Sequence, residues 1–191
     1  YECINEFQNE VPQDNMSRFK QVYENSNKLI KVVNPKNKTD VCFDGVPPYA
    51  KMNQPRQRRF KGSLTNKILD KLLGSWNRNQ ITPGTKFMND LDEYLMSKFG
   101  KETTIVFSPS SEPSEGEHKI SNIIKSNSMF KNHNLIIYGL DADLFMLGLL
   151  LVYRDYKIFL YKETQHFSYI NKINEEEKYY FDIQLFSQEL G

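Results

Sequence analysis

Short apolar runs alternate along the chain with longer stretches in which apolar positions recur every three or four residues. The longer stretches predict amphipathic helices, because this spacing gathers the apolar side chains on one helical face. The short runs are rich in β-branched and aromatic residues and predict strands. The expected helices cover residues 14–33, part of 50–73, a segment from Thr82-Pro83 to Gly100, 117–127, 141–152 and 182–190. The expected strands cover residues 39–43, 103–107, 135–138 and 157–161.

This order of elements predicts an α/β fold with a mainly parallel, twisted sheet flanked by helices, because strands that alternate with helices form parallel crossover units. The length of 191 residues suits one domain with a real core. The chain begins at Tyr1 rather than Met, and Gly191 directly follows an expected helix. We therefore expect it to be a piece of a larger protein.

Composition narrows the function classes. The 25 Lys and Arg residues nearly balance the 24 Asp and Glu residues, which excludes a uniformly basic nucleic-acid coat and leaves only a local basic patch. Two cysteines, Cys3 and Cys42, exclude a disulfide scaffold and indicate a reducing, intracellular compartment. Within the cell we expect the cytoplasm rather than the nucleus. The longest apolar run, residues 144–153, is about half of what a bilayer requires, so no membrane partner is expected.

Acidic residues follow three of the four expected strands. They are Asp44 after the first strand, Glu115 and Glu117 after the second, and Asp141 and Asp143 after the third. Ligands of open parallel sheets bind beyond the carboxyl ends of the strands, so we expect these acids on one rim. Acids two residues apart share a face only in an extended or turn segment, and Gly116 and Gly139 permit that geometry.

Five carboxylates in one cleft would repel one another. At ~4 Å and an effective dielectric of ~20, each like-charged pair costs about 4 kcal/mol, which divalent cations would offset. Oxygen ligands indicate Mg²⁺ or Mn²⁺ rather than zinc, and two such ions about 3.5–4 Å apart can hydrolyse a phosphodiester. The alternative is a set of solvated loop acids. We interpret His118 as a packing or hydrogen-bonding residue at a helix start rather than a metal ligand.

A basic patch follows the first acid. Residues 51–67 hold six cations and no acid, including three of the six arginines of the chain. The planar guanidinium suits bidentate phosphate binding. Because the patch starts seven residues after Asp44, we expect it near the carboxylates, as in a nucleic-acid phosphodiesterase. A solvated basic helix face is the alternative.

Four sequence blocks together resemble the Xrn-type 5′→3′ exoribonucleases of eukaryotes and some large DNA viruses. The blocks are residues 44–54 with Arg58-Arg59-Phe60, residues 79–85 with 87–88, residues 115–120, and residues 138–144. Their order and spacing fit this family from about residue 39 to residue 164. The excess of Lys and Asn is typical of an AT-rich genome, which suits a large DNA virus among other sources.

The resemblance implies a PIN/flap-nuclease-like α/β core with a site for two Mg²⁺ ions. Carried over by position, the metal-site acids would be Asp44, Glu115, Glu117, Asp141 and Asp143. The pocket that selects a 5′-monophosphate would hold Lys51, Arg58 and Arg59. Members of the family hydrolyse 5′-monophosphorylated single-stranded RNA processively to nucleoside monophosphates, and a cap or triphosphate blocks them.

The chain departs from the family pattern at several positions. Pro55 replaces the usual fourth pocket residue, Gln, and offers no side-chain donor. Tyr49 replaces an arginine, and Ser114 replaces a glycine, which we expect to stiffen that turn. The opening strand with its Asp-Met-Asn motif and a later acid-bearing segment are absent. We therefore expect residues 1–191 to be part of a single Xrn N-terminal catalytic domain, incomplete at both ends, which can be inactive alone while the parent protein is active.

Two alternatives to the exoribonuclease stay open. A catalytically inactive RNA-binding or scaffold module of the same fold is suggested by Pro55, although all five visible acids are retained. A structure-specific flap-type DNA nuclease would fit the acids, although the basic block from Lys51 to Arg59 argues against it.

Overall fold

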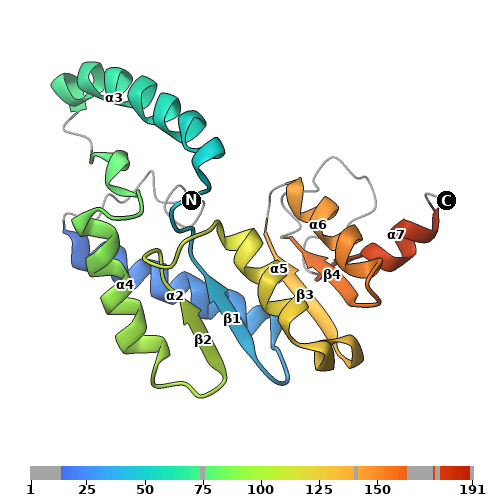
Figure 1. Cartoon of the computed structure of the whole chain (residues 1–191). Coiled ribbons are helices and arrows are strands. Elements are labelled where there is room, and N and C mark those ends of the chain that lie inside the picture. Colours follow the sequence, from blue (N-terminus) through green and yellow to red (C-terminus); the bar gives the residue numbers. More distant parts are fainter. Residues whose placement is uncertain (1–13, 74–75, 140–141, 163–173, 175–176, 190–191) are drawn as a thin grey trace. The chain divides into compact units, whose positions relative to one another are not determined.

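A computed structural model describes residues 14–73, 76–139, 142–162, 174 and 177–189 of the chain (Figure 1). It divides into two compact units, Tyr1–Gly116 and Glu117–Gly191. In each unit helices accompany a small sheet that contains a parallel pair of strands. The fold is therefore mixed α/β, as expected.

The first unit is built around a two-stranded parallel sheet. Its elements are α2 (Asn15–Val33), β1 (Thr39–Cys42), the 3₁₀ helix η1 (Tyr49–Lys51), α3 (Asn53–Leu73), the 3₁₀ helix η2 (Arg78–Gln80), α4 (Lys86–Phe99) and β2 (Ile105–Ser108). β1 pairs with β2 in a register that sets Thr39 opposite Ile105 and Cys42 opposite Ser108. α2 packs on α4, and α4 packs on β2 (Figure 1).

Aromatic side chains fill the core of this unit. Phe19 of α2 lies 5.2 Å from Phe87 of α4, measured between ring centroids, and Tyr23 lies 5.3 Å from Phe99. Trp76 closes the same core, with its ring 5.0 Å from that of Phe87. Phe19, Tyr23, Phe87 and Phe99 occupy helical positions that the apolar periodicity of α2 and α4 predicts.

The expected start of α4 at Thr82-Pro83 is wrong. The N-cap is Thr85, whose hydroxyl accepts a hydrogen bond from Met88 N at 3.3 Å, and α4 begins at Lys86. Gly84 has a φ of 86°, which a right-handed helix cannot contain, so the Thr82–Thr85 segment forms a turn closed by Thr85 N and Thr82 O at 3.1 Å. The expected end of the helix at Gly100 is confirmed.

The second unit holds a three-stranded sheet. α5 (Gly116–Ser126) enters it, followed by the 3₁₀ helix η3 (Ser128–Asn132), β3 (Asn134–Tyr138), α6 (Asp143–Val152), β4 (Lys157–Tyr161), β5 (Tyr180–Asp182) and α7 (Ile183–Glu189). β3 and β4 are parallel, and β5 is antiparallel to β4. Ile158 of β4 and Ile183 of α7 are fully buried between the sheet and its helices.

All four expected strands are present, whereas β5 was not predicted, because its three residues are too few to show an alternating pattern. α6 begins at Asp143, and the expected first position of that helix, Asp141, lies outside the described residues. Among the helices that the structure describes, none combines the length and apolar character needed to span a bilayer.

Candidate metal and phosphate site

Asp44 lies just beyond β1, and its carboxylate caps the start of α5. Oδ1 of Asp44 accepts a hydrogen bond from Gly116 N at 2.6 Å. The first N–H groups of a helix have no partner within the helix, and the helix dipole favours a negative charge there. Two residues 72 positions apart in the sequence are thereby joined, and Asp44 is fixed beside the segment that carries Glu115.

Backbone hydrogen bonds hold the two loops that meet at this point. Gly45 N donates to Ser114 O at 2.8 Å, and Ser114 N donates to Val46 O at 2.9 Å. A Cβ atom on Gly45 would lie 1.7 Å from Glu112 O, so only glycine permits this approach. Ser114 has a φ of 93°, a conformation that favours glycine and costs other residues about 1–3 kcal/mol. The loop therefore accepts strain directly before Glu115.

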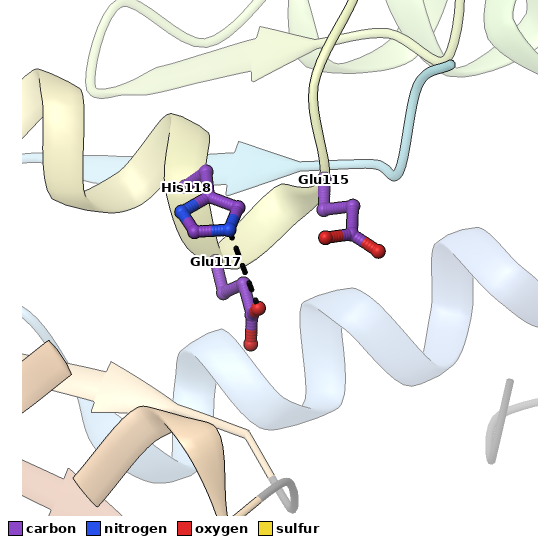
Figure 2. Close-up of side chains that lie close together, drawn as sticks. All are labelled: Glu115, Glu117 and His118. Atoms are coloured by element: carbon purple, nitrogen blue, oxygen red, sulfur yellow. Dashed lines mark ion pairs between the residues drawn. The ribbon is translucent and has the colours of Figure 1, made fainter. Parts of the chain in front are cut away.

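Three side chains at the start of α5 form a group that could hold a metal ion. Figure 2 shows Glu115 on the segment that leads into α5, and Glu117 and His118 on its first turn. One ligand atom from each of the three lies within 4.8 Å of the others. The side chains of Glu115 and Glu117 are 19% and 14% exposed, so both carboxylates are largely withdrawn from water. Such carboxylate oxygens suit a hard divalent cation.

His118 has a place in this group that the sequence interpretation did not give it. Its Nε2 lies 3.8 Å from Glu117 Oε1, an ion pair when the imidazole is protonated (Figure 2). The His118 side chain is 46% exposed. The signal available in the sequence was its adjacency to Glu117.

Lys51 makes a direct contact with one of these acids. Its Nζ lies 2.8 Å from Glu115 Oε2, a charge-assisted hydrogen bond between residues 64 positions apart. Lys51 ends η1, and its side chain is 42% exposed. A lysine predicted for the phosphate pocket thus touches a carboxylate predicted for the metal site.

The structure does not bring the other predicted residues into this contact. Arg58 is exposed and Arg59 half-buried on α3, and neither forms an ion pair among the residues described. Asp143 is exposed in the first turn of α6. Asp141 lies outside the described residues. Among the described residues, the structure therefore places a group of carboxylates at the start of α5 with Lys51 at its edge.

Comparison with known proteins assigns the chain to a family. Residues 1–163 match the family model described as the XRN 5'-3' exonuclease N-terminus. The chain belongs to this family. Among its relatives, 5'-3' exoribonuclease 2 of Schizosaccharomyces pombe is 34% identical over 162 residues, which cover 67% of this chain and 16% of that protein. 5'-3' exoribonuclease 1 of Saccharomyces cerevisiae is 40% identical over 145 residues, covering 63% of this chain and 9% of that protein.

The human relative gives the same picture. 5'-3' exoribonuclease 1 of Homo sapiens is 38% identical over 144 residues, which cover 63% of this chain and 8% of that protein. The chain thus spans less than a fifth of the length of each of these three Xrn-family relatives. The resemblance noted from the sequence blocks is confirmed. The match covers only a small part of each relative, so it identifies the family and not the activity of the whole protein.

Proposed function

We propose that the protein is a metal-dependent 5′→3′ exoribonuclease that hydrolyses 5′-monophosphorylated single-stranded RNA to nucleoside monophosphates. One observation carries the proposal: Asp44, Glu115 and Lys51, which are distant in the sequence, meet at the start of α5. Carboxylates that can hold a metal beside a cation that can hold a phosphate are what phosphodiester hydrolysis requires. The names of the Xrn-family relatives supply the direction and the RNA substrate.

The metal ions in this proposal are two Mg²⁺, with Mn²⁺ as a substitute. The residues that would hold them are Asp44, Glu115, Glu117, Asp141 and Asp143. When bound, such ions activate water and stabilise the leaving oxygen of the phosphodiester. Support comes from the donor set, because Glu115 and Glu117 offer oxygen atoms within 4.8 Å of each other.

The 5′-phosphate pocket in this proposal holds Lys51, Arg58 and Arg59. Arginine would fix the phosphate with two parallel hydrogen bonds, and lysine would add a point charge. Pro55, at the position of the usual glutamine, lies in the first turn of α3, where a proline fits a helix because the N–H that it lacks would be unpaired there. The substitution therefore leaves the helix intact and removes one donor from the pocket.

The remaining expectations are proposals of the same kind. The chain would form part of a single PIN/flap-nuclease-like catalytic domain with a mainly parallel twisted sheet, which the parallel pairs β1–β2 and β3–β4 support. An intracellular location is proposed from the two cysteines, and within the cell we propose the cytoplasm rather than the nucleus. The second candidate function is an inactive RNA-binding or scaffold module, favoured by the lost donor at Pro55.

The test uses one RNA sequence with three 5′ ends: monophosphate, hydroxyl and triphosphate. Each is incubated with the protein in its complete reading frame, with Mg²⁺ or with EDTA, and released nucleotides are separated by chromatography. We expect nucleoside monophosphates only from the monophosphorylated RNA and only with Mg²⁺. Binding of RNA without release would favour the scaffold module, and preferential cleavage of flap DNA would favour the flap nuclease.

A further inference from the structure

The ion pair between Lys51 and Glu115 joins two functions in one contact. Lys51 Nζ and Glu115 Oε2 are 2.8 Å apart, which is the distance of a charge-assisted hydrogen bond. In the proposed function, Glu115 binds metal and Lys51 binds the RNA 5′-phosphate. Lys51 and Glu115 therefore form an ion pair with each other when neither the RNA 5′-phosphate nor a metal ion is bound.

A divalent cation at Glu115 would compete with Lys51. Both bind through the carboxylate oxygens, and a divalent ion carries twice the charge of the ammonium group. A cation at this group would also repel Nζ electrostatically. Binding of the metal therefore weakens the hold of Glu115 on Lys51.

The ion pair is weak enough to exchange. The Lys51 side chain is 42% exposed and that of Glu115 is 19% exposed. An ion pair with one partner this exposed favours the paired over the unpaired state of the two side chains by a factor of only about two to five. A 5′-phosphate, which carries three strong acceptor oxygens, is a strong alternative partner for the ammonium group of Lys51.

We propose that Lys51 exchanges between Glu115 and the RNA 5′-phosphate, so that metal binding at the carboxylates switches on the selection of 5′-phosphorylated RNA. This inference rests on the proposed function and adds its regulation. Without metal, Lys51 neutralises Glu115 and contributes little to the phosphate pocket. With metal bound, Lys51 contacts the 5′-phosphate instead of Glu115. The protein therefore binds 5′-phosphorylated RNA preferentially only when the metal needed for hydrolysis is present.

The decisive measurement is RNA binding in EDTA, where no turnover occurs. Fluorescence anisotropy gives the Kd of two RNAs of one sequence, one with a 5′-phosphate and one with a 5′-hydroxyl. The ratio of the two values is the 5′-phosphate preference. In Glu115→Gln, Lys51 loses its ion pair with residue 115, so we expect the preference to rise about two- to fivefold over wild type without any metal.

Glu117→Gln is the matched control. It removes the same charge two residues further along the chain and leaves the Lys51–Glu115 pair in place. We expect its preference to stay near that of wild type. In the double variant Lys51→Met/Glu115→Gln, we expect the gain to disappear, because the released lysine is gone. An equal rise in Glu115→Gln and Glu117→Gln, or a gain that persists in the double variant, would overturn the exchange.

Metal affinity gives a second measurement that is independent of RNA. Removing the competing ammonium in Lys51→Met should tighten Mn²⁺ binding about two- to fivefold, measured by electron paramagnetic resonance of the free ion. Lys86→Met is its control, because Lys86 forms a comparable 2.8 Å ion pair with Asp90 on α4. Unchanged Mn²⁺ affinity in Lys51→Met contradicts the exchange. The proposed function has its own test. Absence of Mg²⁺-dependent turnover of the monophosphorylated RNA would contradict that function, whatever the binding measurements show.

Discussion

The buried pair Asp92–Ser110 anchors the loop that leads to the candidate site, and its removal gives a measurable cost. Asp92 of α4 is 4% exposed and Ser110 is 1% exposed. The Asp92 carboxylate accepts hydrogen bonds from Ser110 N at 3.1 Å and from Ser110 Oγ at 2.7 Å. Ser110 follows β2 and precedes Glu115, so Asp92→Ala removes the attachment of this loop to α4.

The two hydrogen bonds set the expected magnitude. A hydrogen bond to a charged group contributes about 1.5–3 kcal/mol to stability. Removal of the carboxylate also ends the cost of burying its charge, which offsets part of the loss. We expect Asp92→Ala to lower the free energy of unfolding by about 3 kcal/mol.

Two milder variants grade the effect. Asp92→Asn keeps an oxygen for Ser110 N and offers an N–H to Ser110 Oγ, so we expect a loss of about 1 kcal/mol. Ser110→Ala deletes only the hydroxyl, with an expected loss of about 1.5 kcal/mol.

Urea unfolding followed by tryptophan fluorescence measures the free energy of unfolding of all three variants. Trp76, the only tryptophan, packs against Phe87 in the same unit and reports on it. A loss in Asp92→Ala no larger than in Asp92→Asn would refute the reasoning.

Three further predictions concern the loop, the pocket and a helix cap. Gly45→Ala places a Cβ 1.7 Å from Glu112 O and should cost about 2–3 kcal/mol in the same urea titration, and unchanged stability would contradict the close approach. Arg58→Ala should lower the preference for 5′-monophosphorylated over 5′-hydroxyl RNA about tenfold while slowing hydrolysis less, and equal loss on both RNAs would disprove its pocket role. A backbone hydrogen bond from Ser17 lowers the pKa of Asp14 below 3.8, so its carboxylate stabilises α2 above pH 3.8 and less as the pH falls through the lowered pKa. Thermal unfolding should therefore show a deficit in Asp14→Ala at pH 7 that shrinks in acid, and a deficit that is constant with pH would count against this cap.

Local patterns predicted the helices well where their ends have chemical signals. α2 was expected from residue 14 and begins at Asn15, because Asp14 caps it through Ser17 N at 2.6 Å. The start of α4 was misplaced because Thr82-Pro83 resembles a cap and first turn, while the positive φ of Gly84 is visible only in the structure.

The sequence predicted which residues belong to the candidate site, but only some of the contacts between them. The position of acids after strands indicated that Asp44 and Glu115 would be close, and the structure joins their loops through Gly116 N. The ion pair of Lys51 with Glu115 spans 64 positions, and no local pattern in one sequence encodes such a contact. The roles of the acids, of Arg58 and of Arg59 stay predictions.

Hydrolysis of RNA at the proposed metal-site carboxylates is the central claim, and one measurement tests it most directly. Release of nucleoside monophosphates from 5′-monophosphorylated RNA with Mg²⁺ is compared between the wild-type protein, Glu117→Gln and Asp141→Ala, with RNA binding measured beside it. We predict that both variants bind RNA and that both lose turnover by at least about a hundredfold, since metal ligands stabilise the transition state by several kcal/mol. Turnover at the wild-type rate in either variant would contradict the metal assignment.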